Sequence, residues 1–155
     1  MTREEKIKEL EETIKKAKEE IDQLKNRTEA NYVPYEDETF YMIDCDGEVI
    51  LESWFYGDYC TGLLAIGNVF ETKEQAEFAV EKLKVETELR RFACPFDEDE
   101  FNFSIVWDVD ERKIIADAER HYMSTNIYFK AESIAQQAID TVGEDRIKKY
   151  YFGVD

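Results

Sequence analysis

The stretch Gly67–Phe92, GNVFETKEQAEFAVEKLKVETELRRF, decides the fold, because it predicts the end of a strand, a capped turn and a long helix. Thr72 and Gln75 have the spacing of a capping box, in which hydroxyl and amide satisfy backbone groups at a helix start. Apolar residues then recur at helical spacing, while charged residues fall on other faces. The apolar positions are Ala76, Ala79, Val80 and Leu83.

A shorter version of this stretch returns near the C-terminus. FETKEQAEFAV from Phe70 aligns without a gap with FKAESIAQQAI from Phe129, and the matching positions are those that a strand-to-helix unit would bury. This match predicts an internal duplication of residues 31–94 and 97–155, each a β-β-β-α half with an antiparallel sheet. The alternative is two unrelated helices that share alanine-rich core faces.

The expected strands follow from turn signals and alternating patterns. In the first half, Asp46-Gly47 predicts a hairpin between two strands, and a third strand is expected before the long helix. The second half repeats this order around a turn at 110–112, followed by a helix and a short final helix. The expected strands are Phe40–Ile43, Val49–Trp54, Leu63–Phe70, Phe103–Val109, Lys113–Asp117 and Asn126–Phe129, and the final helices are Glu132–Val142 and Glu144–Tyr151.

Residues 1–30 form a segment of their own, ahead of an acidic α+β domain at 31–155. Isoleucine recurs at heptad position a, and leucine or alanine at position d, which favours a parallel two-stranded coiled coil and a homodimer. The positions are Ile7, Ile14 and Ile21 at a, and Leu10, Ala17 and Leu24 at d. The alternative is a helix packed on its own domain. The predicted fold class is therefore α+β, with an N-terminal coiled-coil helix and two similar halves.

The net charge of −17 is unevenly distributed, because residues 31–155 hold 12 basic and 28 acidic side chains. Such a domain repels nucleic acid and anionic membranes and favours basic protein surfaces, although solubility alone could explain the charge. No apolar run approaches the roughly 20 residues that a membrane span needs. The N-terminus is a charged helix rather than a signal peptide, so we expect a cytoplasmic protein. The three cysteines, odd in number, are expected to be reduced thiols.

No motif of a common enzyme class is present, and we assign no catalytic, cofactor-binding or metal-binding residue. His121 is the one histidine and has no nucleophile pattern near it in sequence. The carboxylate clusters could bind a hard cation, but none fits a twelve-residue calcium loop. A small enzyme that uses acidic residues and His121 stays open as an alternative.

Surface chemistry offers the better candidates, because acidic residues alternate with aromatic ones in two regions. Exposed tyrosines among carboxylates suit the capture of a basic protein surface, since rings anchor and charges steer. Phe40, Tyr41, Trp54 and Phe103 are expected in the core. The candidate partner-binding residues are Glu52, Tyr56, Asp58, Tyr59, Asp97, Glu98, Asp99, Glu100, Asp108 and Asp110.

Two segments, GNVFETKEQAEFAVEKLKV and GEDRIKKYYFGV, resemble parts of small accessory proteins encoded by phages and prophages of Gram-positive bacteria. The resemblance covers residues 31–155 and implies a setting in the host cell, with no catalytic motif to transfer. Small acidic phage proteins are often inhibitors of host defence, which suggests an inhibitor of a host defence nuclease, of anti-CRISPR or anti-restriction type. Its carboxylates would stand where DNA phosphates sit. The alternative is a structural or regulatory homodimeric phage accessory protein without a nuclease target.

Overall fold

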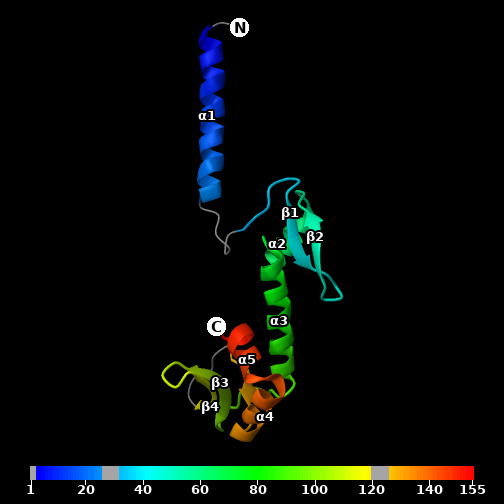
Figure 1. The fold of residues 1–155 in the computed structure, drawn as a ribbon, viewed down its shortest axis with the longest axis vertical. Coiled ribbons are helices and arrows are strands. Elements are labelled where there is room, and N and C mark those ends of the chain that lie inside the picture. The colour runs from blue at the N-terminus through cyan, green and yellow to red at the C-terminus, as the bar shows by residue number, and fades with distance from the viewer. Residues whose placement is uncertain (1–2, 26–31, 120–125) are drawn as a thin grey trace. The chain divides into compact units, whose positions relative to one another are not determined.

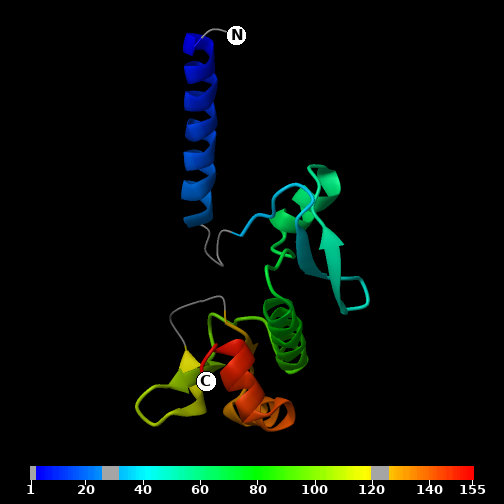
Figure 2. The ribbon, with the colours of Figure 1, turned by 45° about the horizontal axis from the view of Figure 1, so that its top comes forward.

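The computed structural model describes residues 3–25, 32–119 and 126–155. The chain divides into two compact units, one formed by residues 1–42 with 50–72 and the other by residues 43–49 with 73–155. Helices accompany two small antiparallel sheets (Figures 1 and 2), so the predicted α+β class is confirmed. Every helix among the described residues is too short or too polar to cross a lipid bilayer.

The N-terminal segment forms one continuous helix, α1 (Arg3–Lys25), as Figures 1 and 2 show. Its sequence is rich in lysine and glutamate, two residues with high intrinsic helix propensity. The side chains of Ile7, Leu10, Ile14 and Ala17 are exposed. The side chains of Ile21 and Leu24, also assigned to the coiled-coil seam, lie outside the described residues.

The predicted hairpin of β1 (Thr39–Ile43) and β2 (Val49–Ser53) is present; most of its strand residues belong to the first unit, and its turn falls in residues 43–49, which are assigned to the second unit. Gly47 takes the positive φ of +80° that the turn requires. An oxygen of Asp44 accepts the backbone N–H groups of Asp46 and Glu48, both at 2.9 Å, and so holds the turn. The core of the first unit consists of Tyr32, Phe40, Met42, Trp54 and Cys60.

The prediction of a third strand at Leu63–Phe70 was wrong, and with it the β-β-β-α order of the first half. The chain instead forms helix α2 (Asp58–Ala65). Cys60, Leu63 and Leu64 have helical spacing, and all three pack in the core of the first unit. Only Phe70 pairs with the hairpin, through an isolated antiparallel bridge to Tyr41.

The second unit combines the long helix α3 (Lys73–Arg90), which begins directly after Thr72 as predicted, with a three-stranded sheet in the order β4-β3-β5. The sheet is followed by two helices and a π-helical turn. The bounds are β3 (Asn102–Asp108), β4 (Lys113–Glu119), β5 (Tyr128–Phe129), α4 (Glu132–Val142), α5 (Glu144–Arg146) and η2 (Ile147–Tyr151).

The core of the second unit joins α3 to the sheet and to α4. Val85 and Leu89 of α3 are fully buried in it. Their cluster also contains Ile105, Ile114, Ile127, Phe129, Ala135, Ala138, Ile139, Val142 and Ile147. The long helix is therefore part of the second core, although the chain enters it directly from the first unit.

Arg146 fastens the C-terminal helix to α3. Its guanidinium donates to both carboxylate oxygens of Glu88, at 2.9 and 3.2 Å, and this contact raises the pKa of Arg146. Glu81 lies 3.7 Å from the same guanidinium. The hydrogen bond from Lys84, with Arg146 acting in the same direction, lowers the pKa of Glu81.

The two hairpins share one feature that the alignment anticipates. Phe70 pairs with Tyr41 on β1, and Phe129 pairs with Phe103 on β3, so each aligned phenylalanine meets the first strand of its hairpin. A helix begins at Lys73 after the first and at Glu132 after the second. The duplication stays a prediction, which this shared pairing supports.

Candidate protein-binding surface

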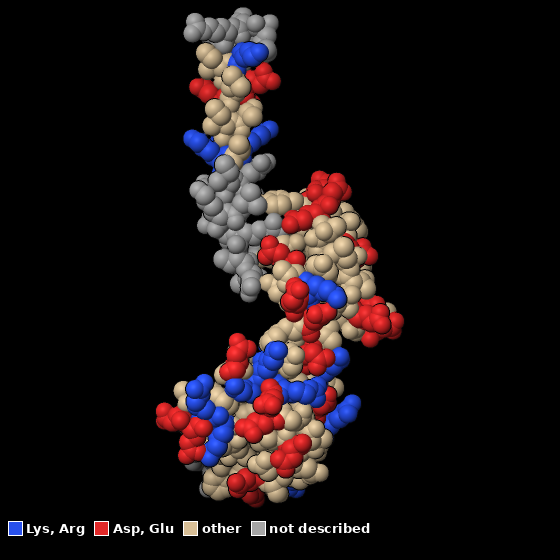
Figure 3. All heavy atoms as spheres, in the orientation of Figure 1, with Lys and Arg blue, Asp and Glu red and all other residues tan. Residues whose placement is uncertain are grey.

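The stretch from residue 32 to residue 72 contains no lysine or arginine. Its nine carboxylates are Glu36, Asp37, Glu38, Asp44, Asp46, Glu48, Glu52, Asp58 and Glu71. Residues 73–155, by contrast, contain lysine and arginine side chains among the carboxylates (Figure 3), although residues 92–111 have none. This long stretch therefore contains nine carboxylates and no cation of its own to neutralise them. Summing the charge over residues 31–155 concealed this feature, although the sequence contains it.

Exposed aromatic rings lie within the same stretch. The side chains of Phe55, Tyr56 and Tyr59 are 48%, 67% and 52% exposed. Large rings in water are unfavourable unless they later pack against something, and tyrosine is enriched where protein interfaces form. With Glu52 on β2 and Asp58 in the first turn of α2, these rings make up what we call the tyrosine face.

The rings of the tyrosine face are anchored in the core. Phe40 and Trp54, both essentially buried, meet edge to face at 5.7 Å, and Trp54 meets Tyr56 edge to face at 6.4 Å. Phe55 and Tyr59 stack at 6.2 Å with an angle of 10° between their planes. The hydroxyl of Tyr59 also donates to the sulfur of Met42 at 3.5 Å. These contacts hold the exposed rings in place before any partner arrives.

The four candidates Glu52, Tyr56, Asp58 and Tyr59 thus share one short segment, from β2 into α2. Asp58 and both tyrosines are exposed, and Glu52 is half-buried. Asp58 also lies in the first turn of α2, where a carboxylate is favoured by the helix dipole. The structure therefore gives Asp58 a structural role in addition to any partner contact.

The other six candidate acids do not form one patch. Asp97, Glu98, Asp99 and Glu100 precede β3, whereas Asp108 ends it and Asp110 follows it. A strand of this length separates its two ends by about 20 Å. Asp108 also caps the turn into β4, because one oxygen accepts the N–H groups of Asp110 and Glu111 at 2.9 Å. These acids therefore belong to two separate loops.

The acidic loop before β3 borders a hollow of about 820 Å³ in the second unit. Asn102, which is buried, fixes this loop: its amide oxygen accepts the N–H of Asp97 at 2.7 Å, and its amide nitrogen donates to the carbonyl of Asp97 at 2.7 Å. The lining residues are Cys94, Pro95, Phe96, Asp97, Glu100, Phe101, Asn102, Phe103 and Lys130.

The lining of this hollow is mixed in character. Phe96, whose ring meets Tyr128 at 5.0 Å, supplies apolar wall together with Phe101 and Phe103, while Asp97 and Glu100 supply negative charge. Aromatic rings beside carboxylates suit a cationic side chain with an apolar stem. Lys130 in the same lining opposes that charge, so the hollow is a weaker candidate than the tyrosine face.

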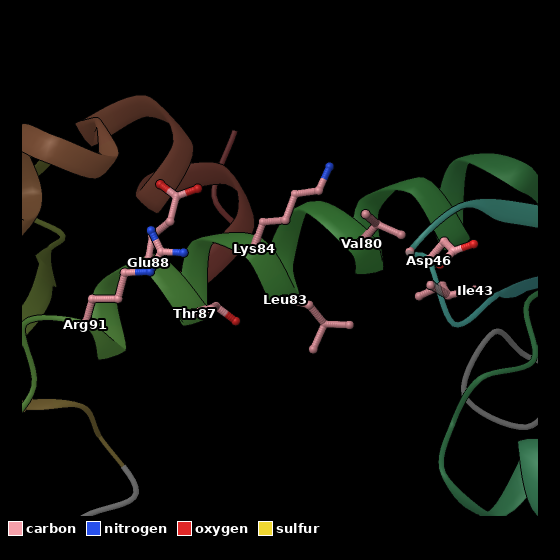
Figure 4. Close-up of a pocket in the computed structure, with 9 residues that line it drawn as sticks. Ile43, Asp46, Val80, Leu83, Lys84, Thr87, Glu88 and Arg91 are labelled. Atoms are coloured by element: carbon pink, nitrogen blue, oxygen red, sulfur yellow. The ribbon is translucent and has the colours of Figure 1, made fainter.

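A smaller hollow of about 350 Å³ lies along α3, with all of its lining residues in the second unit. Figure 4 shows Leu83 and Thr87 projecting from α3 toward the same side, with Ile43 and Asp46 near Val80. Glu88 in this lining is already paired with Arg146. The arrangement offers apolar contact and no convergent set of reactive groups.

The described part of the chain shows no cluster of three or more possible metal ligands, and Cys45, Cys60 and Cys94 are free thiols. His121 lies outside the described residues. The structure confirms Phe40 and Trp54 as core residues, and Tyr41 and Phe103 are half-buried.

No family model, curated protein or solved structure matches the chain significantly. Inferences about function therefore start from the chain's own residues.

Proposed function

We propose that this protein is a non-enzymatic binding protein whose tyrosine face captures a basic surface of a partner protein. The observation that carries this proposal is the set of exposed, pre-ordered rings of Tyr56 and Tyr59 within a stretch that contains no lysine or arginine. The proposed activity needs no cofactor or metal.

The physical reasoning separates the roles of rings and charges. Tyrosine rings that are already ordered lose little conformational entropy on binding, so they are suited to be anchors that dominate the affinity. The surrounding carboxylates raise the rate of encounter with a cationic surface and disfavour acidic partners. The same charges repel phosphates and anionic lipid, so direct binding to nucleic acid or membrane is not part of the proposal.

The partner that this chemistry fits best is a nucleic-acid-binding protein, because such proteins carry extended basic surfaces. With the resemblance to phage accessory proteins, the proposed target is a host defence nuclease, of CRISPR-effector or restriction type, inside the host cell. The carboxylates beside the tyrosine face would occupy positions that DNA phosphates occupy in the nuclease. Inhibition would result from competition for that surface.

The test is inhibition of DNA binding and cleavage across a panel of host nucleases, measured in a salt series. We expect inhibition that weakens with salt and falls about 30-fold or more for the double variant Tyr56→Ala/Tyr59→Ala, as expected when hot-spot rings are removed. Phe101→Ala is the matched control, because it removes a ring that is 53% exposed and belongs to the second unit. The proposal would be contradicted if no nuclease in the panel is inhibited at low salt, or if the double variant inhibits as strongly as the unmodified protein.

A second candidate is a structural or regulatory homodimer in which the acidity serves solvation. The exposed apolar side of α1 favours it, because such a face is normally covered. Deletion of residues 1–28 distinguishes the two functions in the cell. The deletion should abolish activity if the homodimer is the function, and should only weaken it if capture by the tyrosine face is.

A further inference from the structure

One side of α1 carries large apolar side chains that the described chain leaves in solvent. Ile7, Leu10 and Ile14 are 46%, 54% and 54% exposed, and Ala17 is exposed as well. These positions lie three and four residues apart, so they form one stripe along the helix. Burial of this stripe requires an apolar surface on another helix or on the rest of the chain.

We infer that α1 docks on α1 of a second copy of the chain, as a parallel two-stranded coiled coil. Isoleucine at every a position and leucine at two of three d positions is the pattern that favours two parallel strands. Docking the stripe against itself would cover on both helices the side chains that are now exposed. The inference does not depend on the tyrosine face.

The charges that flank the stripe agree with this occupant. In a parallel pair, Lys6 of one helix meets Glu11 of the other, and Glu20 meets Lys25. An antiparallel pair that stacks Ile7 on Leu24 would instead pair Glu11 with Lys18, so the flanking charges favour association without fixing its orientation. The parallel orientation rests on isoleucine at the a positions with leucine at d.

The association should be weak and concentration-dependent. About three heptads lie near the lower limit for an independent coil, and the small side chain of Ala17 leaves the central layer thinly packed. A dimer of this kind would carry two copies of the tyrosine face. A target that contacts both copies at once would be bound with higher apparent affinity than a target that contacts one.

The first measurement is the mass of the full chain by sedimentation equilibrium over a range of concentrations. We expect a shift from the monomer mass of 18.3 kDa toward twice that value as concentration rises. Ile14→Asp should return the mass to that of the monomer, while Lys16→Gln, which changes the charge equally but lies off the stripe, should not. Monomer mass at the highest concentration reached, or a dimer that Ile14→Asp leaves intact, would overturn the inference. In either case the nuclease assay of the tyrosine face is unaffected.

Orientation is tested by disulfide trapping in a chain with Cys45→Ser and Cys94→Ser. A parallel coil places position 10 against position 10 of the other copy, so Leu10→Cys alone should form a covalent dimer under mild oxidation. An antiparallel coil places position 10 against position 21. Trapping that requires a mixture of the Leu10→Cys and Ile21→Cys chains would overturn the parallel arrangement.

Discussion

Replacement of Asn102 by alanine should destabilise the second unit by about 2–3 kcal/mol, at roughly 1 kcal/mol for each hydrogen bond lost. The buried amide makes three bonds with the acidic loop: two of 2.7 Å with the N–H and carbonyl of Asp97, and one of 3.3 Å with the carbonyl of Glu100. In Asn102→Ala these backbone groups must form hydrogen bonds with water instead, and the loop loses the contact that fixes its conformation. For a chain of this size the loss corresponds to a fall of about 5–10 °C in Tm.

The assay is urea unfolding followed by circular dichroism, with the free energy extrapolated to water. Asp99→Ala is the matched control, because Asp99 lies in the same loop and only its backbone N–H is engaged, with Asp97 at 2.9 Å. The control should change the free energy of unfolding by less than about 0.5 kcal/mol, as surface substitutions do. A loss for Asn102→Ala no greater than that of the control would refute the view that this amide holds the acidic loop.

Four further predictions test other parts of the structure. Gly62→Ala should stabilise the protein by about 0.5–1 kcal/mol, since alanine favours helix, and a Cβ there meets nothing within 4 Å in α2. Gly47→Ala should lower the free energy of unfolding by about 1 kcal/mol, since an alanine is strained at positive φ. Urea unfolding in which Gly62→Ala and Gly47→Ala change this free energy in the same direction would contradict these two predictions. Arg146→Gln should cost less than about 1 kcal/mol, and less still in high salt, since its pair with Glu88 is partly exposed; a larger, salt-independent loss would show that the pair matters more. Burial raises the pKa of Tyr151, so its neutral phenol stabilises the fold fully below about pH 10 and this stability is lost as pH rises through the raised folded pKa; an alkaline fall in Tm that is as steep in Tyr151→Phe would argue against it.

Local signals explain which elements were predictable. The helix Glu132–Val142 was predicted with the bounds that α4 has, because apolar period and Gly143 as the following residue both mark it. The hairpin of β1 and β2 followed from Asp46-Gly47, where glycine alone accepts the turn's backbone without strain. Signals of this kind act over a few residues, so no knowledge of the tertiary structure was needed.

The segment before α3 could not be resolved by the same reasoning. Leu63, Leu64 and Ile66 form a short apolar run, which is compatible with a buried strand or with one face of a helix. The helix is favoured by packing in the core of the first unit, where Cys60 and Leu64 belong to one cluster. Gly62, which lies between them, is typical of a turn, although in the structure it lies within α2 with open space around it.

Carboxylates in turns were the main ambiguity in the candidate site. Asp108 was a candidate for partner binding, but it accepts backbone N–H groups in its hairpin turn, as Asp44 does in the first hairpin. The sequence context of Asp108 alone does not separate the two roles. The tyrosine face was anticipated in part, through Tyr56 and Tyr59. Its anchoring through Trp54 depends on packing between Phe40 of β1 and the segment between β2 and α2, which only the structure provides.

The most direct test of the central claim is the hydrogen-exchange footprint of the protein bound to the partner that it retains from host cells. The account predicts a basic nucleic-acid-binding partner, with slowed amide exchange centred on residues 52–59 that disappears when salt dissociates the complex. Slowed exchange confined to other segments, such as the loop before β3, would contradict the claim, and so would a stable complex with an acidic partner.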